Sequence, residues 1–324
     1  MKEKLLQALK VAIGITITTV LLFILLDWIV FSFFYTALDS RQIKPDGVAF
    51  CLNMKNITYE KLKKLQFPAR PIAGENYKKP GIIMFGCSYG YGSPYKNIEP
   101  TLQYKLSEKL KVPVYNRSNP GYAPQMAIFQ IRSHEFDNEI KNCKYAMYVT
   151  IGEHFWRVYA HSAGWWVPYT WPTCCVKNGE LVEKKSKFPV FDGSYIYKYI
   201  KKLLYAATYT KQIENGTCNP KIKEYMCDFY KLHFETINKE LKKINPDIQF
   251  VILVYKDQYD FYAELPIWND LEKEGIKVVK VCKELPELPG EMKDGYMYPN
   301  DGHPTEKAWI KVADLLVDKK KILQ

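Results

Sequence analysis

The longest apolar segment of the chain, from Val11 to Leu38, most constrains how the chain can fold. It is interrupted mainly by Asp27, and it exceeds the roughly 20 apolar residues that a helix needs to cross a bilayer. No convincing small-residue cleavage site follows it, so we interpret residues 1–38 as a cytoplasmic tip and an uncleaved signal anchor. The alternative is a buried hairpin of core helices. In the anchor interpretation the remaining chain must build a core of its own.

The charges around this segment predict its orientation. Lys2, Lys4 and Lys10 precede it, and further basic residues follow it, so the asymmetry is modest. The positive-inside rule then places the N-terminus in the cytoplasm. We therefore expect a single-pass protein of the cytoplasmic (inner) membrane of a bacterium, with its large domain on the extracytoplasmic, periplasmic side.

Composition narrows the possible partners. Lys and Arg number 46 against 35 Asp and Glu, which gives a formal net charge of +11. Such an excess fits an anionic membrane surface, an acidic polymer or nucleic acid. The chain has no dense basic run and no nucleic-acid motif, so we do not expect nucleic-acid binding. It also has no C-x-x-C pair, so we expect neither a metal ion nor another cofactor.

Strand and helix patterns alternate after a polar connector at residues 39–80. Strands are predicted at 81–86, 112–116, 145–152, 248–255 and the end of 271–281, and helices at 101–110, 125–133, 225–244 and 305–319. This alternation predicts an α/β domain over 81–324, whose parallel sheet is covered by helices on both faces. Residues 157–215 break the alternation and form an aromatic-rich insertion or lid.

A candidate nucleophile follows the first predicted strand. Gly86 to Gly90 read G-C-S-Y-G, which matches the G-x-S-x-G turn that presents a serine at a strand-to-helix junction. Ser88 is the candidate, and Cys87 beside it is a rival. Since adjacent side chains point apart, an outward Ser88 leaves Cys87 as a structural residue.

The other two parts of a catalytic triad lie near the end of the chain. Asp301 and His303 belong to D-G-H-P, just before the last predicted helix. A serine nucleophile needs a base to take its proton, and the base needs a carboxylate to orient it. Taken alone, D-G-H-P is also a common turn sequence.

Four sequence blocks in this order resemble the SGNH/GDSL hydrolase superfamily. They are FGCSYGYG at 85–92, YNRSNPGYAPQ at 115–125, YVTIGEHFWR at 148–157 and DGHP at 301–304. Within that superfamily the chain resembles membrane-anchored bacterial members that are linked to surface polysaccharide modification. The resemblance implies a three-layer α/β/α, flavodoxin-like domain and a serine esterase.

The resemblance also implies roles for single residues. The backbone N–H groups of Ser88 and Gly121 would form the oxyanion hole. The third block lacks the usual asparagine, so His154 would be the third donor and Arg157 would hold an anionic group of the substrate. The usual D-x-x-H spacing is absent because position 300 is Asn, which leaves Asp301 as the acid.

The insertion suggests the substrate class. Trp156, Trp165 and Trp166 could form a stacking platform for sugar rings or the core of a hydrophobic lid. With the resemblance, this predicts an esterase that acts on O-acyl groups, above all O-acetyl groups, of an extracytoplasmic glycan. Three alternatives stay open: an O-acetyltransferase, which needs a multi-span membrane partner to deliver the acetyl donor, a catalytically silent glycan-binding or assembly protein, and a lipid esterase.

Overall fold

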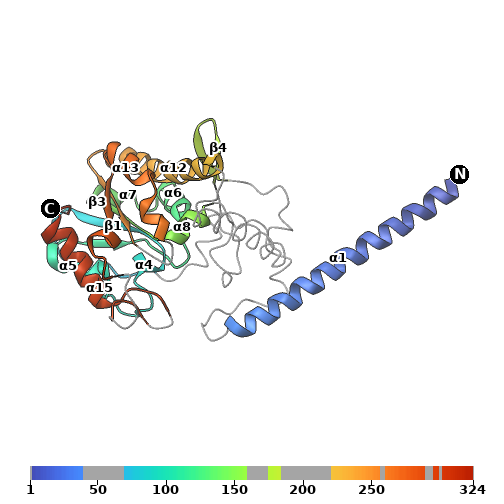
Figure 1. Cartoon of the computed structure of the whole chain (residues 1–324), viewed down its shortest axis with the longest axis horizontal. Helices are drawn as coiled ribbons and strands as arrows, with labels where there is room; N and C mark the ends of the chain where they lie inside the picture. The colour runs from blue at the N-terminus through green and yellow to red at the C-terminus, as the bar shows by residue number, and fades with distance from the viewer. Residues whose placement is uncertain are drawn as a thin grey trace.

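The computed structural model describes residues 2–38, 69–158, 174–183, 220–255, 260–288, 295–298 and 301–323. An N-terminal helix, α1 (Lys2–Leu38), precedes a domain built on a parallel sheet (Figure 1). The apolar stretch Leu9–Leu26 of α1 is long enough to cross a membrane, and none of it is buried against the rest of the protein. A signal sequence near the N-terminus would have the same length and composition.

The sheet has five strands, all parallel: β1 (Gly81–Gly86), β2 (Val114–Asn116), β3 (Cys143–Thr150), β6 (Gln249–Val254) and β7 (Lys277–Lys280). Their spatial order is β2-β1-β3-β6-β7. Counted along the chain this is 2-1-3-4-5, the flavodoxin-like order, so the expected fold class is confirmed. The order reverses between β1 and β3, and ligands of such sheets bind beyond the carboxyl ends of the strands at that point.

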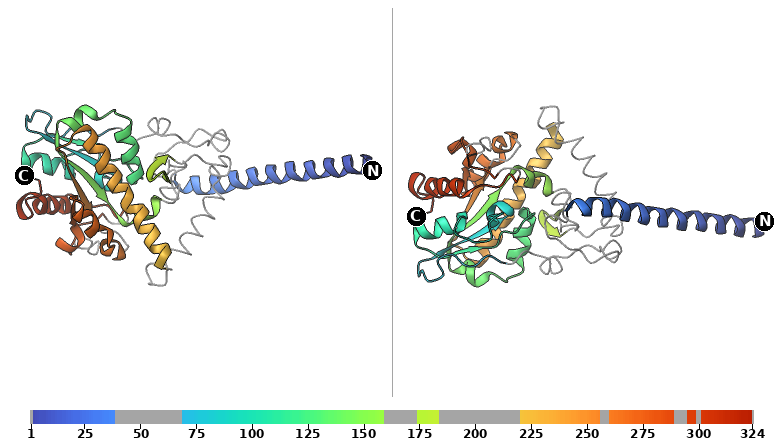
Figure 2. Two further views of the ribbon diagram at one scale, coloured as in Figure 1. Left: turned by 90° about the horizontal axis from the view of Figure 1, so that it is seen from above. Right: turned by 90° about the horizontal axis from the view of Figure 1, so that it is seen from below.

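Both faces of the sheet are covered by helices because its strands are apolar on both sides (Figure 2). In β1, Ile83 and Phe85 pack into one core cluster, whereas Ile82 and Met84 pack into the other. Alternate residues of a strand point to opposite faces, so a continuous apolar run requires a cover on each face.

The first cluster lies against α6 (Pro124–Arg132) and α12 (Pro220–Ile244), and the second against α5 (Leu102–Leu110) and α15 (Glu306–Asp314). A π-helical turn, Leu315–Lys319, extends α15, so this helix runs as far as predicted. Other short helices of the sheet domain include α7 (Asp137–Lys141), α13 (Ile267–Lys273), α14 (Val281–Glu284) and the 3-10 turn Asp260–Glu264.

Residues 69–80, which the sequence pattern assigns to the connector, pack against the sheet domain. Arg70 and Ala73 are buried, and Ala73 forms a β-bridge with Val114 beside the edge strand β2. The Gln103 side chain donates a hydrogen bond of 2.6 Å to the Pro71 carbonyl. The connector pattern missed these contacts because they are made by single residues and not by a periodic element.

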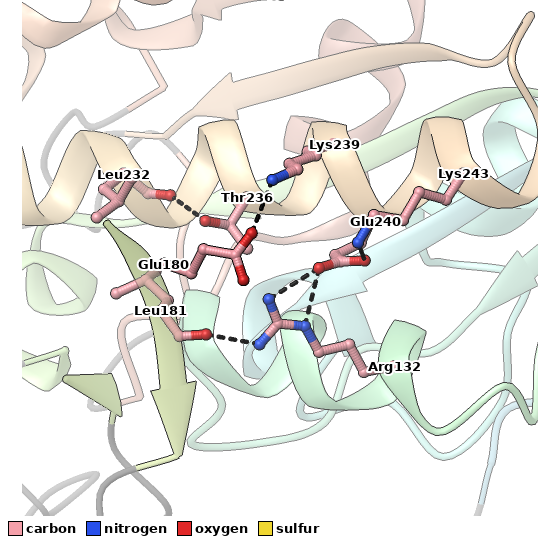
Figure 3. A network of polar contacts seen from close by, with 8 residues as sticks. All are labelled: Arg132, Glu180, Leu181, Leu232, Thr236, Lys239, Glu240 and Lys243. Carbon is pink, nitrogen blue, oxygen red and sulfur yellow. Dashed lines mark hydrogen bonds and ion pairs between the residues drawn. The ribbon is translucent and has the colours of Figure 1, made fainter. Parts of the chain in front are cut away.

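The described part of the insertion is a two-stranded hairpin, β4 (Cys174–Lys177) and β5 (Glu180–Glu183). Arg132 of α6 joins this hairpin to α12: it donates to the Leu181 carbonyl at 2.7 Å and to the Glu240 carboxylate at 2.8 and 2.9 Å (Figure 3). A second ion pair, Lys239 with Glu180 at 3.0 Å, links α12 to the hairpin directly. The hairpin is therefore docked on the α6–α12 face of the sheet domain.

Candidate active site

Ser88 stands at the point where β1 passes into a short helix. β1 ends at Gly86, and α4 (Ser88–Tyr91) begins at the serine itself. Gly90 lies so close to the neighbouring loop that a Cβ on it would be 2.5 Å from Ser118 Oγ. The second glycine of the G-x-S-x-G sequence is therefore required by packing, and Ser88 lies beside the reversal point of the sheet.

His303 and Asp301 meet Ser88 although His303 is 215 residues away in sequence. The Nε2 atom of His303 lies 2.7 Å from Ser88 Oγ, and its Nδ1 atom lies 2.6 Å from an Asp301 carboxylate oxygen. The side chains of His303 and Asp301 are 18% and 38% exposed, so the group is open to solvent. The tautomer that fits both contacts carries its proton on Nδ1, which leaves Nε2 to accept the serine proton.

The loop that carries this pair folds back on itself. Met297 and Pro304 form a β-bridge, the Tyr298 amide donates to the His303 carbonyl at 2.9 Å, and the Thr305 amide donates to the Tyr296 carbonyl at 2.9 Å. D-G-H-P thus forms the turn that its sequence suggests, and the turn also presents His303 to Ser88.

Cys87 does not present its thiol to solvent at the site. Its side chain is fully buried in the core between the sheet, α5 and α15. Burial raises the pKa of the Cys87 thiol, so the thiolate that would make it a nucleophile is disfavoured. Cys87 is a core residue, as the sequence suggests.

The second sequence block, residues 115–125, includes the loop that follows β2. Hydrogen bonds join this block to the end of β1 and to the turn that follows it. The Asn119 amide donates to the Gly86 carbonyl at 3.0 Å, and the Asn116 side chain donates to the Gly90 carbonyl at 2.7 Å. Gly121 follows in this loop with a φ of +83°, in the left-handed region that favours glycine. The structure thus places the loop that contains Gly121 next to the turn that contains Ser88.

The third block forms α8 (Gly152–Arg157) after β3, and His154 points into the core. Its Nδ1 atom lies 3.2 Å from both Tyr148 Oη and Thr150 Oγ1, and its Nε2 atom is buried as well. Burial and the positive charge of Arg157 hold the pKa of His154 well below its ordinary value. This placement does not support the expectation that His154 donates to a substrate, because neither nitrogen reaches solvent.

Arg157 is also held within the protein. Its guanidinium pairs with Glu153, and it donates to the Tyr122 carbonyl in the second-block loop at 3.4 Å. Burial disfavours the charge, but the Glu153 carboxylate holds the pKa of Arg157 above its ordinary value. Arg157 therefore ties α8 to the loop of Gly121, and its contact with an anionic substrate stays a prediction.

The tryptophans expected at the substrate site are not described by the structure. The backbone of Trp156 lies in α8, but its side chain is outside the described part, as are Trp165 and Trp166. Whether they stack on sugar rings stays a prediction.

A buried network of hydroxyl groups near α8 has no signal in the sequence. Thr150 Oγ1 lies 2.8 Å from Tyr230 Oη and 2.6 Å from Tyr262 Oη. These residues come from three separate elements, so no local pattern joins them. Within the described ranges, no group of three or more His, Cys, Asp or Glu side chains could hold a metal ion.

No protein-family model and no curated protein matches the chain. Among solved structures, a lipase from a goat rumen metagenome shares 9% identity and a TM-score of 0.45, with 74% of this chain and 96% of that chain covered. A putative GDSL-like lipase from Parabacteroides merdae shares 14% identity and a TM-score of 0.40, with 77% and 99% covered. An acetyl xylan esterase from the rumen bacterium Butyrivibrio proteoclasticus shares 12% identity and a TM-score of 0.41, with 76% and 65% covered. At these scores the likeness does not extend to activity or substrate.

Proposed function

We propose that the chain is a serine esterase of the SGNH type. The observation that carries the proposal is the chain of contacts from Ser88 Oγ through the His303 ring to the Asp301 carboxylate. A serine, a histidine and a carboxylate in this order define the machinery of acyl transfer on several unrelated folds.

In this mechanism Ser88 Oγ attacks the carbonyl carbon of an ester while His303 Nε2 takes the serine proton. Collapse of the tetrahedral intermediate breaks the bond to the alcohol, which leaves with the proton from His303. Water then attacks the acyl-Ser88 ester by the same steps and releases the acid. Asp301 holds the ring and stabilises the imidazolium.

The charge that develops on the carbonyl oxygen needs hydrogen-bond donors. We assign this role to the backbone N–H groups of Ser88 and Gly121, which lie on the adjoining turn and loop. Loss of one such donor typically lowers the rate by about 10²–10³-fold. We do not assign His154 to the oxyanion hole, because its ring is fully buried in the core.

The substrate we propose is an O-acetylated glycan outside the cytoplasm. An N-terminal helix long enough to cross a membrane supports an anchored protein, and the lysines before it support a cytoplasmic N-terminus with the domain outside. The solvent-open position of His303 and Asp301 supports a large substrate that reaches the site from the surface.

The test is hydrolysis of p-nitrophenyl acetate and of an acetylated oligosaccharide by the full-length chain in detergent micelles. Ser88→Ala should abolish acetate release and labelling by a fluorophosphonate probe. Ser133→Ala is the matched control, because the Ser133 hydroxyl donates to the Gln130 carbonyl of its own helix at 2.8 Å. Activity that survives Ser88→Ala would refute the proposal.

The same assay separates the alternatives. Labelling of Ser88 without hydrolysis, followed by transfer to an added sugar acceptor, would indicate an acetyltransferase. A preference for long-chain acyl esters would indicate a lipid esterase. Glycan binding with neither labelling nor hydrolysis would indicate a silent binding protein.

A further inference from the structure

Two tyrosines that follow the nucleophile contact the loop that carries Asp301 and His303. The Tyr89 hydroxyl donates to the Gly302 carbonyl at 2.6 Å, and the Tyr89 ring lies 5.2 Å from the His303 ring. Gly302 joins Asp301 to His303, so this hydrogen bond acts on the peptide between them.

Tyr95 contacts both sides of the same loop. Its hydroxyl accepts a hydrogen bond of 2.5 Å from the Glu306 amide, just after the loop. Its ring packs edge-on against Tyr298, just before Asp301, with 5.4 Å between centroids. Tyr89 and Tyr95 therefore hold the loop at its middle, its start and its end.

Arg70 in turn holds the segment that carries Tyr95. The buried guanidinium donates to the carbonyls of Lys96 at 2.7 Å, Tyr95 at 2.5 Å, Tyr91 at 3.1 Å and Gly92 at 3.3 Å. It also lies 4.1 Å from the centroid of the Tyr91 ring. The Arg70 side chain thus donates hydrogen bonds to four backbone carbonyl groups of one short loop.

We propose that Arg70, Tyr89 and Tyr95, which we call the brace, are positioning residues that hold His303 in register with Ser88. The inference rests on the proposed function for its catalytic consequence. The Ser88 and His303 elements are distant in sequence, and reacting groups lose much of their rate when misplaced by about 1 Å. The brace supplies the contacts that tie one element to the other.

The brace also links the site to the chain that leads to α1. Arg70 is buried in the stretch that the sequence pattern assigns to the connector. A connector residue therefore acts on the loop after Ser88, and through Tyr95 on the loop of His303.

The test compares Tyr89→Phe, Tyr95→Phe and Arg70→Lys in the full-length chain in detergent micelles. Each tyrosine variant loses one hydroxyl, so kcat for p-nitrophenyl acetate should fall about three- to tenfold with KM unchanged, while the free energy of unfolding falls by no more than about 1.5 kcal/mol. Arg70→Lys should lower kcat further, because three ammonium protons cannot serve four carbonyls. Tyr77→Phe is the matched control, since the Tyr77 hydroxyl donates to Glu108 on the surface, and it should change nothing.

Two further measurements separate positioning from general damage. In a His303→Ala background, Tyr89→Phe should have no additional effect, because Tyr89 acts through His303. Hydrogen–deuterium exchange of residues 295–306 should be faster in the Tyr95→Phe variant than in Tyr77→Phe.

The outcomes are distinguishable. The proposed role of the brace would be refuted if its variants left both kcat and the hydrogen–deuterium exchange of residues 295–306 unchanged. It would also be refuted if Tyr89→Phe lowered kcat by the same factor in the wild-type and His303→Ala backgrounds. A wild-type chain that neither hydrolyses esters nor reacts with the fluorophosphonate would instead refute the proposed function. The hydrogen–deuterium exchange of residues 295–306 would then be the test of whether the brace holds this loop.

Discussion

His303 and His154 occupy opposite environments, although both belong to sequence blocks that suggest a catalytic site. His303 lies on a loop that is partly open to solvent, with a carboxylate at one nitrogen and a serine hydroxyl at the other. His154 lies in α8 with its ring fully buried beside the hydroxyls of Tyr148 and Thr150.

The difference shows how the surroundings decide the role of a histidine. The Asp301 carboxylate contacts Nδ1 of His303 and orients the ring, so that Nε2 faces the Ser88 hydroxyl and is placed to act as a base. Burial disfavours that charge, and the nearby Arg157 disfavours it further, so His154 stays neutral. The first histidine can take a proton during a reaction, whereas the second stabilises the position of α8.

The largest expected effect tests the catalytic side of this comparison. His303→Ala should lower kcat for p-nitrophenyl acetate by about 10⁴–10⁶-fold, because Ser88 loses its base. Thermal unfolding should stay within about 2 °C of wild type, since the ring is partly exposed. His134→Asn, at an exposed histidine, should leave kcat unchanged. A modest loss in His303→Ala would remove His303 from the mechanism.

A smaller loss is expected when the partner of His303 is changed. Asp301→Asn keeps the size of the side chain but removes the charge that orients the ring, and kcat should fall about 10²–10⁴-fold. The measurement is steady-state kinetics with p-nitrophenyl acetate. Asp318→Asn, at a surface ion pair with Lys109, is the control. If Asp301→Asn matched wild type, another group would have to orient His303.

His154→Leu should show the reverse pattern. The Tyr148 and Thr150 hydroxyls would lose a buried partner, so the free energy of unfolding should fall by about 1–3 kcal/mol. At a temperature where the variant is folded, kcat should change less than about threefold. Denaturant unfolding followed by tryptophan fluorescence measures the first quantity. A loss of kcat as large as that in Asp301→Asn would show that His154 belongs to the chemistry.

The last effect concerns the pH dependence of stability, and a third histidine isolates it. Burial in α12 lowers the pKa of His233 to about 4, whereas an unfolded histidine titrates near 6.5. Between these values the unfolded chain binds a proton that the native chain does not, so stability is present above about pH 6.5 and is lost as the pH falls. From pH 7 to pH 5 this one group should contribute a loss of about 2 kcal/mol.

Replacement of His233 by leucine should reduce that loss, which denaturant unfolding at both pH values would measure. His134→Asn is again the control, because His134 is exposed. An unchanged pH dependence in His233→Leu would show that burial does not act on His233 in this way. The same burial argument applied to His154 would then be weakened.

Much of the fold was predictable because its elements are long and periodic. The apolar runs of β1, β3 and β6 and the amphipathic pattern of α15 each carry their signal within a few neighbouring residues. Short elements such as α4, α7 and the β4–β5 hairpin span too few residues to show a period, and they were not predicted.

The candidate site was predictable only in part. Ser88, Asp301 and His303 stand in recognisable local sequences, and the structure brings them together. The burial of His154 and Arg157 and the brace around Arg70 depend on contacts between elements far apart in the chain. No window of sequence contains both members of such a contact.

The sequence by itself determined the apolar N-terminal segment, the order of the strands and helices along the chain, and the identity of the three side chains that meet at the site. Only the tertiary structure decided the spatial order of the strands, the packing of Arg70 on the loop after Ser88, and which histidine faces Ser88. The physical reason is that hydrophobic periodicity is a local property of the chain, whereas burial depends on every element that packs against a residue.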